Sequence, residues 1–313
     1  MDNPRAGEEN GATKISDTIL LILEIFLFLA RTLVLYVHGV YKVFFPPEEK
    51  SVAGEIVLIT GTGHGIGKEL ARQYGELGAE VVCVDINKET NNETVEELTK
   101  MGIKAHGYTC DVSSWETVNE LQQKVEKEVG DVSILVNNAG IMPCKSFFAH
   151  KPEEIRKMFE INVFAHFWML QAFLPKMMKK NKGHVVAISS VAGLVGGANV
   201  VPYCGSKFAV RGYMEGIAEE FRKENRDIKF TTIYPFITDT GLCKRPRIRF
   251  SNCMKILSPA ETAAYIITAQ RRNYNEAAVP PYLFFVNAFV RTLPRPCGHQ
   301  LIDFLDSGVE PHV

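Results

Sequence analysis

The sequence has no surplus of charge, no paired cysteines and no internal repeat. Its 35 Lys and Arg residues nearly balance its 36 Asp and Glu residues, so the net charge of −1 leaves no electrostatic footprint for nucleic acid. The cysteines form no CxxC pair and do not cluster with histidine, so no metal site is predicted. They are typical of reduced thiols in a protein that faces the cytosol. The seven are Cys83, Cys110, Cys144, Cys204, Cys243, Cys253 and Cys297.

Long apolar runs are confined to the first fifty residues. The stretch TILLILEIFLFLARTLVLYVHGV, residues 18–40, would form a helix about 35 Å long, enough to span a bilayer. The two charged residues inside it are equally compatible with a helix or hairpin lying in one leaflet. A buried core helix is the alternative without a membrane. We predict a leader over residues 1–17 and a hydrophobic membrane anchor over residues 18–45.

After this stretch, short apolar runs alternate with longer amphipathic segments. The runs EIVLIT, EVVCVD, KAHGYTCD, VSILVNNAG, GHVVAISS and FTTIYP are rich in β-branched residues and are typical of strands. Segments of helical length, such as residues 66–77 and 114–129, lie between them. This alternation predicts an α/β fold with a doubly wound parallel sheet, a Rossmann fold. We assign residues 51–257 to that domain and residues 258–313 to C-terminal helices with an interfacial segment.

A glycine-rich turn, TGTGHGIG, follows the first predicted strand and opens the first helix of this domain. Glycine lets the backbone turn tightly and approach a pyrophosphate, and the free amides of the helix N-terminus attract its charge. Eighteen residues after Gly67, Asp85 ends the second strand. A carboxylate there can bind both ribose hydroxyls and repels a 2′-phosphate, which favours NAD over NADP.

Tyr203 and Lys207 lie four residues apart in VPYCGSKFAV, so one helix face would carry both. A nearby ammonium stabilises phenolate over phenol and would make Tyr203 a base near neutral pH. Ser190 ends the strand HVVAISS, where its hydroxyl could bind a carbonyl or alkoxide oxygen. Taken alone, a Tyr-x-x-x-Lys pair is more often a solvated helix face.

In their order and spacing, TGTGHGIG, NNAG, ISSVAG and YCGSK resemble the short-chain dehydrogenase/reductase superfamily over residues 54–241. The resemblance implies a catalytic set of Asn162, Ser190, Tyr203 and Lys207, in which Asn162 positions a water that relays a proton from Lys207. It also implies a cofactor-binding set of Gly61, Gly65, Ile66, Gly67, Asp85, Asp111, Val112, Asn138, Tyr203, Lys207, Thr238 and Thr240. The family usually has Pro-Gly where this chain has Pro235 and Phe236, so the backbone path there is an open question.

The motifs GHGIG, VDIN and AHFWMLQAFLP, with the apolar N-terminus, most resemble the branch that contains 17β-hydroxysteroid dehydrogenases 11 and 13 and epidermal retinol dehydrogenase 2. That resemblance implies an NAD-dependent oxidoreductase for a retinoid, steroid or other lipid alcohol. It also implies a place on the endoplasmic reticulum or a lipid droplet, with the catalytic domain facing the cytosol. The alternative is a lipid-surface scaffold that retains the fold with little turnover. A homodimer is left open.

Two further segments favour a second membrane contact. LCKRPRIRF, residues 242–250, carries four basic residues that could bind anionic lipid. YLFFVNAFVRTL, residues 282–293, is apolar enough to lie in a membrane interface. A solvated loop and a core or dimer helix are the respective alternatives.

Overall fold

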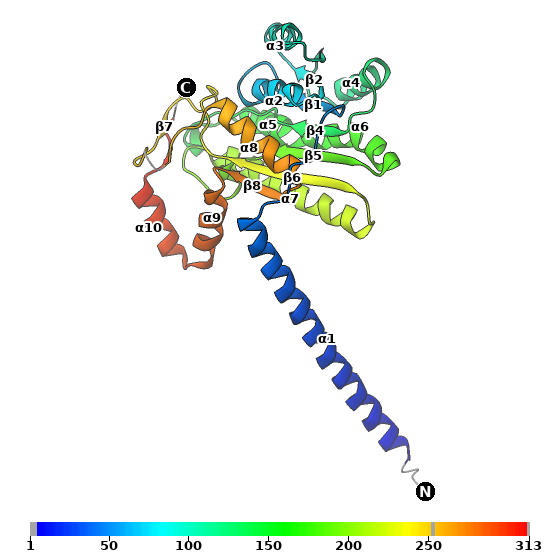
Figure 1. The fold of residues 1–313 in the computed structure, drawn as a ribbon. Helices are drawn as coiled ribbons and strands as arrows, with labels where there is room; N and C mark the ends of the chain where they lie inside the picture. Colours follow the sequence, from blue (N-terminus) through cyan, green and yellow to red (C-terminus); the bar gives the residue numbers. More distant parts are fainter. Residues whose placement is uncertain (1–4, 252–253, 312–313) are drawn as a thin grey trace. The chain divides into compact units, whose positions relative to one another are not determined.

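A computed structural model gives the structure of residues 5–251 and 254–311 (Figure 1). The chain divides into two compact units, residues 1–48 and 49–313. Each unit is described by itself below.

The first unit is a single helix, α1 (Arg5–Phe44), which begins inside the segment that we expected to be a separate leader. The part over Asp17–Phe44 is long and apolar enough to cross a membrane, and none of its most apolar window is buried. Leu, Ile, Val and Phe side chains there are mostly more than half exposed. The structure therefore gives no support to a core helix, the alternative that needs no membrane.

The second unit is built on a sheet of seven strands, all parallel, in the order β3-β2-β1-β4-β5-β6-β8. The predicted doubly wound fold is confirmed. The order reverses between β1 and β4, and such a switch point is where open α/β sheets bind ligands. The strands are β1 (Ile56–Thr60), β2 (Glu80–Asp85), β3 (Ala105–Thr109), β4 (Ile134–Asn137), β5 (Gly183–Ile188), β6 (Ile228–Pro235) and β8 (Glu276–Val279).

Helices cover both faces of this sheet (Figure 1). One face packs against α2 (Gly65–Glu76), α3 (Lys88–Lys100) and α8 (Pro259–Arg271). The other packs against α4 (Trp115–Glu128), α6 (Ala165–Lys180) and α7 (Val201–Lys223). The elements α5 (Pro152–Phe159), a short 3-10 turn η1 (Phe147–Ala149), a π-helical turn η2 (Glu160–Phe164) and a 3-10 turn η3 (Val191–Gly193) complete this part of the fold.

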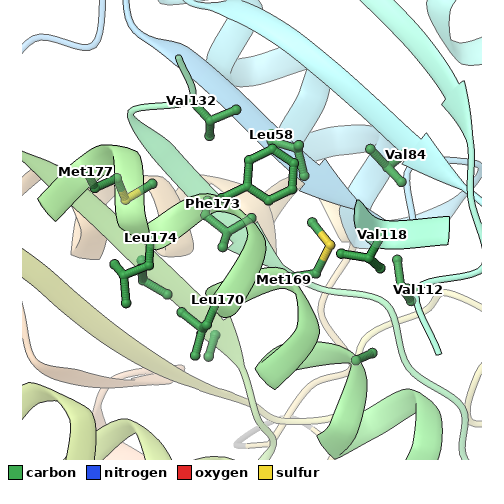
Figure 2. Packing of buried hydrophobic residues seen from close by; sticks show 14 of the residues in the cluster. Leu58, Val84, Val112, Val118, Val132, Met169, Leu170, Phe173, Leu174 and Met177 are labelled. Carbon is green, nitrogen blue, oxygen red and sulfur yellow. The ribbon is translucent and has the colours of Figure 1, made fainter. Parts of the chain in front are cut away.

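The strands bury apolar side chains on both faces, which explains their continuous apolar runs. In β1, Leu58 packs beneath α4 and α6, while its neighbours Val57 and Ile59 face α2 and α8. Figure 2 shows Phe173 and Met169 of α6 packed against Leu58. This two-sided core fixes the strand ends from which the loops of the site project.

The seventh strand lies beyond residue 257, where we expected the sheet domain to end. β8 pairs with β6, and α8 packs beside α2, so the sheet layer continues to Val279. The short run EAAV is only four residues long, with two alanines at its centre, and carries little strand signal. Beyond it come α9 (Tyr282–Thr292), α10 (Arg295–Leu305) and β9 (Gly308–Val309), and β9 pairs antiparallel with the earlier two-residue strand β7 (Pro246–Arg247).

Candidate active site

A cavity of about 660 Å³ opens at the carboxyl ends of the strands, at the switch point. Of the predicted site residues, two are not part of its wall: Asn162 and Gly67 lie behind it. The structure brings the others together around the cavity. They are Gly61, Gly65, Ile66, Asp85, Asp111, Val112, Asn138, Ser190, Tyr203, Lys207, Thr238 and Thr240.

The glycine turn is packed too closely for side chains. Gly61 has a φ of +76° and Gly65 a φ of +60°, both in the left-handed region that favours glycine. A Cβ on Gly67 would overlap the Gly61 carbonyl and come within 2.7 Å of the Asn138 amide nitrogen. The turn therefore lies directly on the first turn of α2, whose free backbone amides face the cavity.

Asp85 is held in place by the same turn. Its Oδ2 accepts a hydrogen bond from the Gly63 amide at 2.8 Å, and its Oδ1 accepts one from the Asn87 amide at 2.8 Å. A Cβ on Gly63 would overlap the hydroxyl of Thr90 and approach this carboxylate. The carboxylate is therefore fixed at the cavity wall beside the turn.

Sequence analysis missed a buried polar clamp beneath the turn. Thr62 donates to Asn91 Oδ1 at 2.6 Å, and Asn91 Nδ2 donates to the carbonyls of Cys83 and Tyr108, both at 3.1 Å. Thr94 also donates to the Thr62 carbonyl at 3.1 Å. The signal was present in the sequence, because Asn91 and Thr94 share one face of α3 with an apolar residue.

The neighbouring loops close the cofactor side. The Asn138 side chain donates to the Thr60 carbonyl at 2.8 Å and joins the loop after β4 to the end of β1. Asp111 accepts two hydrogen bonds from Ser113, at 3.0 Å to the backbone amide and 2.6 Å to the hydroxyl. These contacts order the loop after β3 and tie the loop after β4 to β1 on this side of the cavity.

After β6 the chain turns back over the start of α2, despite lacking the usual Pro-Gly. A Cβ on Gly65 would lie 3.0 Å from the side chain of Thr240, so Thr240 sits against the helix N-terminus. Thr238 is buried, and its hydroxyl lies 3.1 Å from that of Thr262 on α8. Both threonines line the cavity.

Ser190, Tyr203 and Lys207 meet on the opposite side. The Ser190 hydroxyl accepts from the Ala192 amide at 3.1 Å and hydrogen-bonds the Tyr203 phenol. Lys207, one turn further along α7, has its Nζ 5.6 Å from the centre of the Tyr203 ring and donates to the Ile188 carbonyl at 2.9 Å. The predicted shared helix face is therefore present, and it is buried rather than solvated.

The acid–base properties differ from our expectation. Burial raises the pKa of Tyr203 to about 12, although the hydrogen bond from Ser190 opposes that rise. Burial also lowers the pKa of Lys207 to about 8. We expected Lys207 to depress the pKa of Tyr203, but in the protein alone the loss of hydration on burial dominates and raises it. An oxidised nicotinamide brings a further positive charge, which would favour the phenolate.

Asn162 lies in the π-helical turn η2 and is fully buried. Its Oδ1 accepts from the Ile141 amide at 2.9 Å, while its Nδ2 donates to the Ile141 carbonyl at 2.9 Å and to Ser206 at 3.1 Å. A Cβ on Gly140 would lie 3.3 Å from Asn162 Oδ1 and 3.5 Å from Lys207 Nζ, so the two side chains approach the same loop. Asn162 thus holds that loop beside the lysine.

The remaining wall of the cavity is mostly apolar and comes from distant parts of the chain. It includes Met142, Val195, Leu242, Ile302 and Val309. The strand pair β7–β9 closes this side, and we name it, with the residues that join it, the C-terminal strap (residues 245–247 and 306–310).

The strap is held by few contacts. Arg247 pairs with Asp306 at 2.9 Å, the Glu310 amide donates to the Arg245 carbonyl at 3.0 Å, and Asn199 donates to the Val309 carbonyl at 3.1 Å. Sequence analysis missed the strap, because two-residue strands carry no periodic signal. Within residues 5–251 and 254–311, no group of three or more His, Cys, Asp or Glu side chains could hold a metal ion.

The residues present fit a dinucleotide. The glycine turn packs so closely against its neighbours that added side chains would displace it, the helix N-terminus supplies free amides for phosphate, and Asp85 offers acceptors for ribose hydroxyls.

Comparisons with known proteins agree with this geometry. Residues 55–248 match the family model for short chain dehydrogenases. The chain is 40% identical over 272 residues to human 17-beta-hydroxysteroid dehydrogenase 13, covering 87% of this chain and 89% of that one. It is 39% identical over 284 residues to human epidermal retinol dehydrogenase 2, covering 90% and 92%.

The fold itself is shared with more distant proteins. The crystal structure of a short chain dehydrogenase/reductase from Burkholderia phymatum in complex with NAD superposes with a TM-score of 0.70 at 21% identity, covering 84% of this chain and 99% of that one. Together with the family match over residues 55–248, the relatives confirm the branch predicted from the motifs. The chain belongs to the short-chain dehydrogenase family of oxidoreductases.

Proposed function

We propose that this protein uses NAD to interconvert a lipophilic alcohol and its carbonyl at a membrane or lipid-droplet surface. The observation that carries the proposal is the junction of Ser190, Tyr203 and Lys207 with the glycine turn in one cavity. Acid–base groups and a nucleotide cradle lie on its two sides, as hydride transfer requires.

In oxidation, Tyr203 as phenolate takes the proton of the alcohol, and Ser190 holds the alcohol oxygen by a hydrogen bond. A nicotinamide held here would supply the acceptor for the hydride that leaves the carbon bearing this oxygen. Lys207 favours the phenolate by its charge and binds the nicotinamide ribose, while Asn162 fixes the loop beside it. In reduction the same groups act in reverse.

NAD is the proposed cofactor, and NADP is disfavoured. Asp85 has both carboxylate oxygens fixed by backbone amides, so it cannot turn away from a 2′-phosphate without losing those hydrogen bonds. Close charges of like sign repel by about 1 to 4 kcal/mol, depending on the local dielectric. Asp111 and Val112 would contact the adenine, and Thr238 and Thr240 would hold the nicotinamide side.

The substrate class follows from the wall opposite the cofactor. Its mainly aliphatic side chains suit a hydrophobic molecule with one reacting oxygen. The relatives named above are a retinol dehydrogenase and a 17-beta-hydroxysteroid dehydrogenase. Retinol and 17β-hydroxysteroids are therefore the first candidates.

The membrane location rests on α1 and on α9. The apolar face of α1 is exposed, and α9 has no buried residue even though Phe285 and Phe289 lie on it, 58% and 65% exposed. A core helix would bury such residues, so their exposure argues against a core helix over residues 282–293. It suits a helix that lies in a membrane interface, and it is equally compatible with a dimer face. The basic residues of 242–250 are largely exposed and suit anionic lipid.

The deciding experiment is an assay of membrane fractions with NAD+ or NADP+ against retinol, oestradiol and long-chain alcohols. We expect NAD+-linked turnover of at least one of them. Tight NADH binding without turnover across the panel would favour the scaffold alternative instead. Truncation of residues 1–45 should release much of the protein from membranes, and residual binding should weaken with salt.

The cytosolic orientation has its own reporter. Asn92 is exposed on α3 and begins the sequon Asn92-Glu93-Thr94. We expect no glycan there in cells. A mass shift that endoglycosidase removes, and that Asn92→Gln abolishes, would place the domain in the lumen. Asn92→Gln is the suitable control because Thr94 is buried and bonds the glycine turn.

A further inference from the structure

Ser190 begins a short turn whose other end is held by α9. Ser190 is the residue before the 3-10 turn η3, and its hydroxyl accepts from the Ala192 amide. Leu194 ends the same turn, and its amide donates to the Val191 carbonyl at 2.8 Å. We name residues 190–194 the catalytic turn. Because hydrogen bonds join its two ends within one turn of chain, a displacement of Leu194 also displaces Ser190.

Two side chains of α9 bind the carbonyl of Leu194. Asn287 donates from Nδ2 at 3.3 Å. Arg291, one helical turn further on, donates from Nε at 3.2 Å and also from Nη2. Hydrogen bonds from an ionised donor are about twice as strong as those between neutral groups, so Arg291 makes the firmer contact. The position of the catalytic turn therefore depends on where α9 lies.

Arg291 also contacts the helix that carries Tyr203 and Lys207. Its guanidinium carbon lies 5.7 Å from the centre of the Phe208 ring, which follows Lys207 on α7. The catalytic turn is packed on the same helix, since a Cβ on Gly193 would lie 2.7 Å from the Lys207 carbonyl oxygen. Arg291 thus contacts both elements that present the reacting side chains. It acts through them, which makes it a positioning residue.

The helix α9 has two different faces. Its inward face packs into a small core of Leu194, Tyr234, Ala278, Leu283 and Phe284. Its outward face carries Phe285, Val286 and Phe289, which are 58%, 41% and 65% exposed. Their spacing of three and four residues places them in one stripe along the helix. The stripe lies opposite the inward face, so α9 can bind the core and a second apolar surface at the same time.

Basic side chains lie near this stripe. The helices α9 and α10 lie side by side next to β8 (Figure 1), and a Cβ on Gly298 would lie 3.5 Å from Val290 Cγ1. Arg249 of the basic segment 242–250 donates to the Phe304 carbonyl on α10 at 3.2 Å and lies 5.5 Å from the centre of its ring. An apolar stripe bordered by cations fits an anionic lipid surface, where rings enter the acyl boundary and cations meet the headgroups.

We propose that α9 is a lipid-contact surface that also positions the catalytic turn. Its apolar stripe enters an anionic lipid surface, while Asn287 and Arg291 on its inward side hold the Leu194 carbonyl. Lipid on the stripe favours the arrangement in which α9 lies on the core, because only this arrangement satisfies both faces of the helix. The inference rests on the proposed function, which supplies the reaction at Ser190, and adds that lipid contact sets the rate of that reaction.

The test compares variants of the full chain in phosphatidylcholine vesicles with and without phosphatidylserine. The double variant Phe285→Ser/Phe289→Ser removes the stripe. Arg291→Lys keeps the positive charge but loses the planar fork that binds the carbonyl through two nitrogens. Met101→Ser is the matched control, because it removes an apolar side chain that is 51% exposed at the end of α3.

Insertion of the stripe is measured with Phe289→Trp and brominated lipid. The quenching of the new indole is taken over that of the two native tryptophans, Trp115 and Trp168. We expect strong quenching, greater with phosphatidylserine than without it, and we expect Arg291→Lys to leave it unchanged. No quenching beyond that of the native tryptophans would overturn the lipid contact. A dimer in detergent that Phe285→Ser/Phe289→Ser dissociates would assign the face to a second copy of the chain and overturn it as well.

Turnover is followed with the panel of alcohols named above. The stripe variant and Arg291→Lys should each lower kcat by about tenfold to 100-fold in vesicles, because a small misplacement of a reacting group is costly. Their NADH affinity should stay as in the wild type, whereas general damage to the fold would lower both. Met101→Ser should change neither. Values of kcat within twofold of wild type for both variants would overturn the coupling.

Hydrogen exchange separates this failure from failure of the proposed function. The amides of Gly193, Leu194 and Val195 donate within or next to the catalytic turn. In the same vesicles they should exchange about tenfold faster in the stripe variant and in Arg291→Lys than in the wild type. A wild type that shows this difference but no NAD-linked turnover would refute the proposed function and leave the coupling of α9 to the turn in place. Equal exchange in all the proteins would overturn the inference, whatever the activity.

Discussion

The two sides of the cavity are built in different ways. On the cofactor side, the glycine turn, Asp85 and Asn138 are held by short hydrogen bonds to backbone atoms, and buried side chains of α3 support them from below. On the substrate side, the C-terminal strap is a two-residue strand pair joined by an exposed ion pair. The first side is part of the core, and the second is a surface layer laid over it.

The difference is consistent with the proposed function. A dinucleotide presents the same phosphates and riboses each time, so rigid backbone donors are useful and any added atom is harmful. A lipophilic substrate would offer few polar groups, and apolar walls on surface segments can change without disturbing the sheet. We expect substitutions on the cofactor side to cost both folding and binding, and those on the strap to change mainly substrate affinity.

The largest effect is expected where the two sides meet. Tyr203→Phe removes the base but keeps the ring, so kcat should fall at least 100-fold while NADH binding is nearly unchanged. Lys207→Met should reduce both kcat and NADH affinity, because the ammonium is proposed to stabilise the Tyr203 phenolate and to bind the nicotinamide ribose. Turnover rates and NADH fluorescence titrations measure the two separately. More than about a tenth of wild-type kcat in Tyr203→Phe would exclude the tyrosine as the base.

The next effect tests the packing of the cofactor side. Gly67→Ala places a methyl group into the Gly61 carbonyl, so the turn must move, which should cost about 1–3 kcal/mol of stability and most of the NAD affinity. Gly216→Ala on the exposed side of α7 is the control, since its Cβ meets nothing within 4 Å. It should leave stability unchanged or raise it by up to about 1 kcal/mol. Calorimetry and NADH titration would distinguish the two variants, and equal behaviour would contradict the close packing.

The same contrast explains which features could be predicted from the sequence and which could not. The strands could be predicted because a sheet buried on both faces needs continuous apolar runs, as in VVCV of β2. The glycine turn and the Tyr203–Lys207 pair were readable because their chemistry requires fixed residue types at fixed spacing. The boundary near residue 257 was not predictable, since β8 is a four-residue strand with two central alanines that forms by pairing with β6.

Partners in tertiary contacts were hidden. The spacing of Asn91 and Thr94 could mark a shared helix face, but their partner Thr62 and the strap contact of Asn199 lie far away in the sequence, so local pattern does not identify those contacts. The pKa of Tyr203 was predicted in the wrong direction for the protein alone, because spacing reveals the neighbouring charge but not the loss of hydration.

Burial of Lys207 should also appear in the pH dependence of stability. Its folded pKa of about 8 lies below the unfolded value of 10.5, so the unfolded chain binds more protons between these pH values. Stability should therefore rise with pH through this window by about 3 kcal/mol relative to Lys207→Met. Burial also lowers the pKa of Lys50, but Lys50 is present in both proteins, so its contribution cancels when their stabilities are compared. Urea unfolding of the two from pH 7 to 10 measures the difference, and parallel curves would mean that the ammonium is hydrated.

A smaller effect is expected from Asp85→Ser. The serine cannot repel a 2′-phosphate, so the preference for NAD+ over NADP+ should narrow by about tenfold or more in kcat/KM. Because Asp85 also bonds the Gly63 amide, some loss of NAD+ affinity should accompany the change. Steady-state kinetics with both cofactors tests this, and a wild-type preference for NADP+ would show that the carboxylate does not select the nucleotide.

The smallest effect is expected at the strap, where Arg247 and Asp306 are joined at 2.9 Å with side chains 57% and 46% exposed. Exposed pairs contribute at most about 1 kcal/mol, so Arg247→Ala and Asp306→Asn should barely change the melting temperature. Both residues line the cavity, so the variants should change KM for the lipophilic substrate a few-fold while kcat and NAD+ affinity stay constant. The double variant should show no further change, because either substitution already breaks the pair. A kcat loss as large as that of Tyr203→Phe would mean that the strap belongs to the catalytic core and that the two sides of the cavity are not separable.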